Sequence, residues 1–138
     1  MQKHVSYGVI PLKKVNHQWQ VFLVQHQAGH WGFPKGFPEE NEGEREAAER
    51  ELMEECGLHV QRWLSDKAIQ EHYVHDAYGP KTEKTVHYFL AEVEGILRLQ
   101  KAEIQDGKWL DLDSAFFLLT FPASKFVMKE VKQLLILI

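Results

Sequence analysis

The sequence has very little cysteine, no long apolar segment and no excess of positive charge. The single cysteine, Cys56, cannot form an internal disulfide, so a reducing, cytoplasmic setting is expected. No apolar run approaches the ~20 residues that a membrane helix needs, and the N-terminal segment lacks the apolar core of a secretory signal. We therefore expect no membrane partner. A formal net charge of −4 argues against a surface built mainly to coat nucleic acid.

What the sequence does contain is the composition of one globular domain. Its 138 residues are 44% hydrophobic and 26% charged, which is ordinary for a folded soluble chain and not for a disordered one. This length is typical of a domain with one core. We expect a single domain over residues 1–138, acting as a monomer.

The predicted elements run in the order strands, helix, strands, helix. Apolar alternation predicts strands at 4–12 and 19–26, followed by an ordered loop over 27–44 that is rich in glycine and proline. A helix follows over 44–56, with Gly57 as its left-handed cap. Further strands are predicted over 58–64, 69–75, 82–93 and 108–110, before a last helix over about 122–137. This order predicts an α/β fold, with a mixed sheet between helices in an α/β/α sandwich.

The C-terminal tail is unusually apolar. It reads LLILI from Leu134 to Ile138. We interpret it as the buried end of the last helix, with a subunit contact as the alternative.

Three glutamates gather on one face of the predicted helix 44–56. At 100° per residue, Glu51, Glu54 and Glu55 lie within an arc of about 100°. Carboxylates this close repel one another unless a cation lies among them, and Mg²⁺ prefers oxygen ligands. From the helix geometry alone, a solvated acidic face is the alternative interpretation.

The stretch from Gly36 to Leu58, GFPEENEGEREAAERELMEECGL, also fits a spaced pattern, G-x5-E-x7-R-E-U-x-E-E-x-G-U, where U is bulky and apolar. The residues at the fixed positions are Gly36, Glu42, Arg50, Glu51, Leu52, Glu54, Glu55, Gly57 and Leu58. This stretch resembles the Nudix box, the signature of Mg²⁺-dependent hydrolases of nucleoside diphosphates linked to another group. The resemblance implies the Nudix fold and a metal, Mg²⁺ with Mn²⁺ as a substitute, held by the matched glutamates. It also implies that Glu42 pairs with Arg50 to fix the loop on the helix.

Further stretches resemble one branch of this family, the asymmetrically cleaving diadenosine tetraphosphate hydrolases. They are the run W-x-x-P-K-G that ends at Gly36, the segment KTVHYFLAEV over 84–93, and Glu103, six residues before Trp109. The resemblance implies that Glu103 is a further metal ligand, and that Glu54 or Glu103 activates the attacking water.

Two positions depart from that branch. Its members usually carry histidine directly after P-K-G, where this chain has Phe37. Their second adenine-stacking aromatic lies near the C-terminus, where this chain has Leu134. The second stacking partner is therefore unassigned.

Three residues are candidates for substrate binding: Lys35, Lys84 and Tyr88. Lys84 and Tyr88 have the same strand parity and stand about 13 Å apart at ~3.3 Å per residue. That distance lets the ammonium touch a phosphate while the tyrosine ring stacks on adenine, a contact of ~1–3 kcal/mol. The alternatives are a packing role for Tyr88 and solvated lysines. Tyr78 is a second candidate for stacking.

The expected reaction is Mg²⁺-dependent hydrolysis of diadenosine tetraphosphate to ATP and AMP, with water attacking a phosphoanhydride. The partner is then a small dinucleoside polyphosphate. One alternative is an RNA 5′-pyrophosphohydrolase, in which an RNA 5′ end is the partner, although the net charge weighs against it. Another is a hydrolase of a different nucleoside diphosphate derivative, such as a nucleotide sugar. A third is a non-catalytic Nudix module that senses a nucleotide, but such a module should lose box glutamates, and this chain keeps them.

Overall fold

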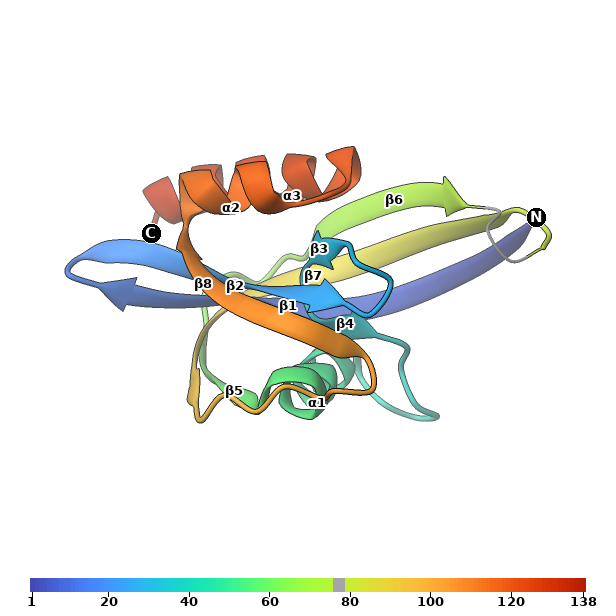
Figure 1. Cartoon of the computed structure of the whole chain (residues 1–138), viewed down its shortest axis with the longest axis horizontal. Coiled ribbons are helices and arrows are strands. Elements are labelled where there is room, and N and C mark those ends of the chain that lie inside the picture. The colour runs from blue at the N-terminus through green and yellow to red at the C-terminus, as the bar shows by residue number, and fades with distance from the viewer. Residues whose placement is uncertain (76–78) are drawn as a thin grey trace.

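The computed structural model of the chain describes residues 1–75 and 79–138. Eight strands in these residues form one mixed sheet between two helical layers (Figure 1). Helix α1 (Glu44–Cys56) covers one face of the sheet, and α2 (Leu112–Leu118) and α3 (Pro122–Ile136) cover the other. This is the α/β/α sandwich that the sequence predicts.

Two long central strands position the rest of the sheet. The strands are β1 (Gln2–Val15), β2 (Gln18–His26), β3 (Trp31–Gly32), β4 (Lys35–Gly36), β5 (Leu58–Trp63), β6 (Ile69–His75), β7 (Thr82–Gly95) and β8 (Ile104–Asp111). The main order is β3-β2-β1-β7-β5, with β4 paired to β1, β6 to β7 and β8 to β2. β1 and β7 run parallel, and the other described pairs are antiparallel. Strands β4 and β7 therefore flank β1 on either side, and each carries one of the predicted phosphate-binding lysines.

Three elements differ from the sequence prediction. Helix α2 was not expected, although Asp111 caps it by accepting a hydrogen bond from the Ser114 amide at 2.8 Å. Strands β3 and β4 lie inside the predicted loop, and β8 begins four residues before the predicted 108–110. Strands β3 and β4 are two residues long and exist through pairing with β2 and β1, a non-local contact that a short sequence pattern does not reveal.

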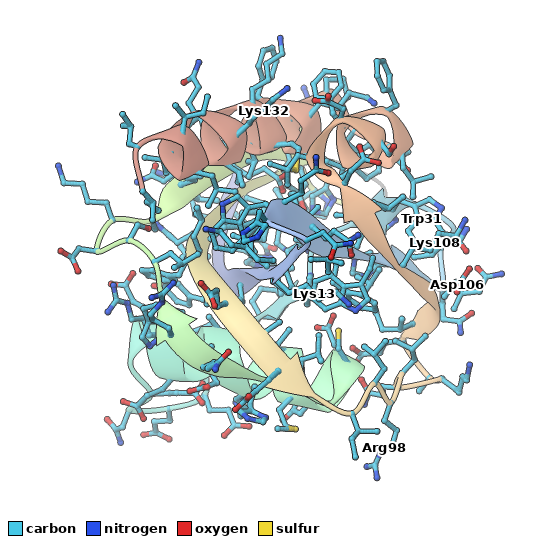
Figure 2. The ribbon with its side chains drawn as sticks, turned by 90° about the vertical axis from the view of Figure 1, so that its left-hand side faces the viewer. Lys13, Trp31, Arg98, Asp106, Lys108 and Lys132 are labelled. Carbon is cyan, nitrogen blue, oxygen red and sulfur yellow. The ribbon has the colours of Figure 1, made fainter. Side chains whose placement is uncertain are left out.

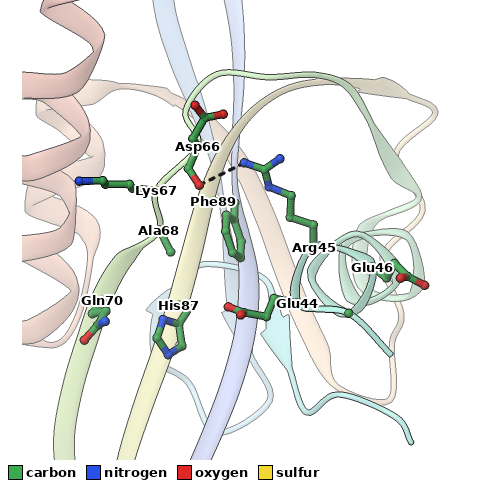
Figure 3. Close-up of a pocket in the computed structure, with 10 residues that line it drawn as sticks. Glu44, Arg45, Glu46, Asp66, Lys67, Ala68, Gln70, His87 and Phe89 are labelled. Carbon is green, nitrogen blue, oxygen red and sulfur yellow. Dashed lines mark hydrogen bonds between the residues drawn. The ribbon is translucent and has the colours of Figure 1, made fainter. Parts of the chain in front are cut away.

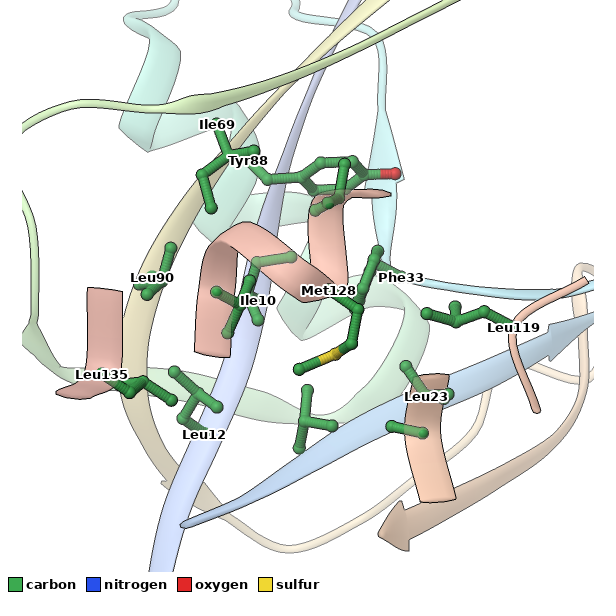
Figure 4. Packing of buried hydrophobic residues seen from close by; sticks show 14 of the residues in the cluster. Ile10, Leu12, Leu23, Phe33, Ile69, Tyr88, Leu90, Leu119, Met128 and Leu135 are labelled. Carbon is green, nitrogen blue, oxygen red and sulfur yellow. The ribbon is translucent and has the colours of Figure 1, made fainter. Parts of the chain in front are cut away.

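The sheet separates two apolar clusters. Neighbouring residues of a strand point to opposite faces, so Val9 packs under α1 while Ile10 packs under α3. On the α3 side, Met128 and Leu135 of the helix meet Leu12 and other strand residues (Figure 4). Both faces are thus covered, and functional side chains must reach solvent at an edge or through a gap between layers.

The C-terminal tail is not buried as a unit. Leu135 is 5% exposed, but Ile136 and Leu137 are 76% and 82% exposed. The expected burial of the tail is wrong beyond Leu135, because successive helix residues are rotated by about 100° and only one of them can face the sheet. No helix in residues 1–75 and 79–138 is long and apolar enough to cross a bilayer.

Gly57 ends α1 in the left-handed conformation that the sequence predicts, with φ of +78°. A Cβ at this position would lie 2.6 Å from the Ile96 carbonyl oxygen. We expect Gly57→Ala to lower the free energy of unfolding by ~1–2 kcal/mol, because it adds backbone strain to a steric overlap. Urea unfolding measures the change. Gly32→Ala is the matched control, since its nearest neighbour would be 3.7 Å away, and an equal loss in both variants would contradict the explanation.

Candidate active site

Arg50 fixes the arrangement of the glutamates on α1. Its Nε and Nη2 donate to the two carboxylate oxygens of Glu42 at 2.8 and 3.0 Å. Its Nη1 donates to Glu51 at 3.0 Å and to Glu54 at 3.1 Å. Nη2 also donates to the Phe37 carbonyl at 2.9 Å. The pairing of Glu42 with Arg50 is confirmed, and it ties the loop after β4 to the helix.

Glu55 is the buried member of the acidic cluster. It is 2% exposed, and its Oε1 has no hydrogen-bond partner among the described residues. Burial and the neighbouring Glu51 carboxyl raise the pKa of Glu55 to about 9. Burial also raises the pKa of Glu51. A buried carboxylate oxygen that receives no hydrogen bond, next to a second carboxyl group, is a favourable position for a cation. The cation would stabilise the charged form of both groups.

Glu54 and Glu103 join this cluster less directly. The Glu54 side chain is half exposed and turned toward Arg50. Glu103 precedes β8 and is exposed, and its charge contributes to the raised pKa of Glu55, so it lies within electrostatic range of the same cluster. Within the described ranges, no three His, Cys, Asp or Glu side chains already form a metal site. The carboxylate oxygens suit Mg²⁺, and Arg50 occupies one oxygen of Glu51 and both oxygens of Glu54 in this structure.

Gly36 makes room for Glu51. A Cβ built on Gly36 would overlap the Glu51 carboxylate, which is the flexible end of a side chain and not backbone. We expect Gly36→Ala to displace that carboxylate, lowering turnover about tenfold, while the free energy of unfolding changes by less than ~1 kcal/mol. Steady-state kinetics and urea unfolding measure the two effects. Unchanged turnover in the folded variant would show that the position of Glu51 does not matter to the reaction.

Lys35 and Lys84 lie together, and Lys35 is close to the acidic cluster. Lys35 is on β4 and Lys84 is on β7. Burial and the nearby Lys35 ammonium lower the pKa of Lys84 to about 8. Lys35 also opposes the rise in the pKa of Glu55 on the α1 side and of Glu71 on the α3 side. The Lys35 ammonium therefore acts on one carboxylate from helix α1 and on another from strand β6 of the sheet.

A pocket of about 390 Å³ opens next to Lys35 on the α3 side of the sheet. We call it the aromatic pocket, because its lining includes His26, His30, Phe33, Tyr73, Tyr88 and Phe121. The His30 ring lies 4.5 Å from the His26 ring and 5.1 Å from the partly exposed Phe121 ring, centroid to centroid. Burial and His30 lower the pKa of His26 to about 3, so the His26 ring is neutral near pH 7. The pocket thus offers flat, uncharged rings next to a cation.

Tyr88 does not present a ring face to this pocket. It is 1% exposed, with its ring edge-on to Phe33 at 5.1 Å. The ring also covers Gly8, where a Cβ would lie 2.8 Å from it. The stacking role predicted for Tyr88 does not fit this placement, because neither face of the ring is open to a base. Tyr78, the other stacking candidate, lies outside the described residues.

Phe37, which replaces the usual histidine, contacts one of the two lysines. The Lys84 ammonium lies 4.8 Å from the centroid of the half-exposed Phe37 ring, and the His4 ring meets Phe37 edge-on at 5.6 Å. A cation over an aromatic face at this distance is attracted by about 0.5–1 kcal/mol when exposed. Phe37 therefore helps to hold Lys84 without supplying a donor of its own.

Trp31 serves the loop and not the pocket. Its backbone amide donates to Thr120 Oγ1 at 2.8 Å. Its ring lies 5.3 Å from the Lys108 ammonium on β8, and the two side chains emerge on the same side of the molecule (Figure 2). These contacts anchor the segment between β2 and β4 to β8 and to the connection between α2 and α3.

A larger hollow, of about 700 Å³, lies on the α1 side of the sheet (Figure 3). Its arginine is already engaged: Arg45 donates to the carbonyl oxygens of Ser65 at 2.9 Å and Asp66 at 3.2 Å. The guanidinium also lies 5.0 Å from the Trp63 ring. Arg45 thus joins α1 to the β5–β6 connection.

Sequence reasoning missed several residues of the aromatic pocket. His30 and Phe121 come from a loop and from the start of α3, which meet only in the folded chain. Glu71 could have been found, because it is the one charged residue in the apolar set Ile69, Glu71 and Tyr73 of a predicted strand. A charge on the buried face of a strand indicates a polar site.

Comparison with known proteins places this site in a family. The NUDIX domain matches residues 2–131. The proteins named bis(5′-nucleosyl)-tetraphosphatase [asymmetrical] of Sus scrofa and Rattus norvegicus are each 35% identical over 121 residues, covering 84% of this chain and 80% of theirs. An 8-oxo-dGTP diphosphatase of Proteus vulgaris is 42% identical over 62 residues, which is 41% of this chain and 52% of that protein.

Solved structures agree at the level of the fold. A binary complex of the C. elegans Ap4A hydrolase has a TM-score of 0.76 and 21% identity, covering 98% of this chain and 99% of its own. The NUDIX domain of Shewanella oneidensis NrtR, complexed with ADP ribose, also has a TM-score of 0.76, with 17% identity and coverage of 98% and 90%. The filled box, the sandwich around it and the near full-length match lead to one conclusion: the chain belongs to the Nudix family of pyrophosphohydrolases.

Proposed function

We propose that this chain hydrolyses diadenosine tetraphosphate and related dinucleoside tetraphosphates asymmetrically, giving ATP and AMP from the adenosine compound. One observation carries the proposal: Lys35, which has Lys84 beside it, lines the aromatic pocket and is also close enough to the buried Glu55 of α1 to oppose the rise in the pKa of that carboxyl. A nucleoside in the pocket would lead its polyphosphate past both ammonium groups to the acidic cluster. The relatives that are named asymmetrical tetraphosphatases support the same substrate class.

Members of this family generally use divalent cations, and we propose Mg²⁺ for this chain. Glu51, Glu54, Glu55 and Glu103 would hold it, with the unpartnered Oε1 of Glu55 as its most buried ligand atom. When bound, the ion neutralises phosphate charge and lowers the pKa of a coordinated water. The cation would also offset the repulsion between the Glu51 and Glu55 carboxyls.

The remaining steps fall to side chains of the chain itself. Glu54 or Glu103 would take the proton of the attacking water, and both carboxylates are open to solvent. Lys35 and Lys84 would donate to phosphate oxygens, where negative charge grows as the phosphoanhydride breaks. Tyr88 would contribute its hydroxyl at the pocket wall and not its ring face, and His30 and Phe121 would supply the apolar surface for the base.

The proposed reaction should depend on pH through the Lys84 side chain. Its pKa of about 8 in the free protein means that the ammonium loses its proton as the pH rises through 8. We therefore expect kcat/KM for diadenosine tetraphosphate to fall above about pH 8, because a neutral amine attracts phosphate less. In Lys84→Arg the side chain stays charged, so this fall should disappear from the pH profile. An identical fall in both proteins would assign it to another group.

The reaction itself is tested on a panel of substrates with Mg²⁺ and then with a chelator in its place. The panel contains diadenosine tetraphosphate, a nucleotide sugar and a 5′-triphosphorylated RNA, and products are resolved by ion-exchange chromatography. The proposal is supported if diadenosine tetraphosphate gives ATP and AMP, if it is hydrolysed faster than the other substrates, and if the chelator abolishes the reaction. Two molecules of ADP would refute the asymmetric cut, and faster release of pyrophosphate from RNA would favour the RNA 5′-pyrophosphohydrolase alternative.

A further inference from the structure

The aromatic pocket contains a buried carboxylate that the proposed reaction does not use. Glu71 on β6 lines the pocket and is 4% exposed. Its Oε2 accepts a hydrogen bond from Ser124 Oγ at 2.8 Å, near the start of α3. A buried carboxylate is costly unless it is hydrogen-bonded or has a ligand to meet, so Glu71 needs an explanation beyond packing.

Glu71 keeps free capacity to accept hydrogen bonds. An ionised carboxylate has about four acceptor sites. The Ser124 hydroxyl occupies one of them, and the Tyr88 hydroxyl is near the same carboxylate; both residues line the pocket. None of the ion pairs in the described part of the chain joins Glu71 to Lys35 or Lys84. Burial raises the pKa of Glu71, and the two lysines, acting at longer range, oppose that rise by favouring the charged form.

The chemistry around Glu71 selects among flat ligands. His30 and Phe121 provide ring surfaces on which any nucleobase can stack, so they do not distinguish one base from another. A carboxylate only accepts, so it pairs best with a base edge that offers two adjacent donors. Guanine presents such an edge in its N1–H and 2-amino groups. Adenine presents one donor, its 6-amino group, beside the acceptor N1, and a carboxylate repels that acceptor.

We propose that Glu71 hydrogen-bonds to the edge of the base in the aromatic pocket. The pocket would therefore bind guanine in preference to adenine. The inference rests on the proposed function, because it takes the pocket to hold one nucleoside of a dinucleoside tetraphosphate. Ser124 would hold the carboxylate in place through one acceptor site of Oε2, leaving free sites on the carboxylate for the two donors of the base. The preferred substrates are then dinucleoside tetraphosphates with at least one guanosine, and diadenosine tetraphosphate is a slower member of the same class.

A mixed substrate measures the preference within one molecule. In adenosine–guanosine tetraphosphate either nucleoside can enter the pocket, and the asymmetric cut then gives GTP with AMP or ATP with GMP. We expect one product pair to exceed the other at least about tenfold in the wild-type protein, since two hydrogen bonds to a base edge discriminate by about that much or more. Hypoxanthine keeps N1–H and lacks the 2-amino group, so adenosine–inosine tetraphosphate should give a smaller ratio.

Glu71→Gln changes the hydrogen-bonding pattern offered to the base without changing the size of the side chain. An amide offers one donor and one acceptor, which suits the adenine edge, so the product ratio should fall toward one or invert. The matched control is Glu130→Gln, an exposed position on α3, which should keep the wild-type ratio. A wild-type ratio near one overturns the inference even if Glu71→Gln fails to fold. A biased ratio that Glu71→Gln leaves unchanged overturns it as well, and would reduce Glu71 to a counter-ion of the lysines.

Failure of the proposed function can be distinguished from failure of the base preference. If the protein cleaves no dinucleoside tetraphosphate, the products say nothing about the base, and calorimetric binding of GTP and ATP to the wild-type protein takes their place. At least about tenfold tighter binding of GTP would sustain the base preference on its own. Equal binding of the two would refute it.

Discussion

Glu55→Gln is expected to lower the turnover of diadenosine tetraphosphate by at least about a hundredfold while leaving the fold intact. The side chain is the most buried of the acidic cluster, and its Oε1 has no partner in the described part of the chain. Glutamine has the same shape but cannot bind a cation with a charged oxygen. Since burial already disfavours the Glu55 charge, we expect the variant to be as stable as the wild-type protein in the absence of metal.

Two measurements separate this prediction from simple misfolding. Steady-state kinetics give the loss of turnover, and thermal melts with and without Mg²⁺ report whether the ion stabilises the native state. Mg²⁺ should raise the Tm of the wild-type protein more than that of Glu55→Gln. Glu46→Gln, an exposed substitution on the same helix, should retain both the turnover and the response to Mg²⁺. Near-normal turnover in a folded Glu55→Gln protein would end the assignment of Glu55 as a metal ligand.

Arg50→Lys is expected to lower the free energy of unfolding by ~2–4 kcal/mol and turnover by at least about tenfold. The guanidinium serves Glu42 with two parallel hydrogen bonds and reaches Glu51 and Glu54 as well. A lysine ammonium keeps the charge but is a point donor, so it cannot occupy all of these positions. The carboxylate of Glu42, which is largely shielded from solvent, would lose part of its pairing.

Urea unfolding and kinetics on the same preparation measure both effects of Arg50→Lys. Arg62→Lys is the control, because Arg62 is well exposed and pairs with a single carboxylate of Glu92. It should change the free energy of unfolding by less than ~0.5 kcal/mol. If Arg50→Lys changes the free energy of unfolding as little as Arg62→Lys does, the positive charge of Arg50 matters and the planar arrangement of its guanidinium donors does not.

Local sequence information predicted the parts of the site that one element contains. Helix α1 and its cap at Gly57 are recoverable from the sequence, because acidic periodicity, a glycine stop and a family pattern all fall within 23 residues. The pairing of Arg50 with Glu42 also lies within this stretch. These features depend on neighbours along the chain, so a single sequence carries them.

Features that depend on distant contacts were not predictable in the same way. The alternation of side chains along a strand correctly placed Lys84 and Tyr88 on one face of β7, but it does not indicate what covers that face. Phe33 and the backbone at Gly8 cover the Tyr88 ring, whereas Lys84 is only partly buried and contacts the exposed Phe37 ring. The aromatic pocket likewise needs the start of α3 to lie over β6, and neither segment carries a local signal for the other.

The parallel pairing of β1 with β7 has a consequence for the order in which activity is acquired. Its register joins Gln2 to Thr82 and His4 to Lys84, so residues some 80 positions apart must meet before Lys84 reaches Lys35. Pairings of this kind form slowly, because a long loop must close before any contact compensates for the lost entropy. During synthesis, a nascent chain that has emerged only as far as β6 holds the whole Nudix box and no Lys84. The box glutamates of the acidic cluster are therefore synthesised before Lys84, and Glu103 only after it, so the proposed substrate site is a late product of folding.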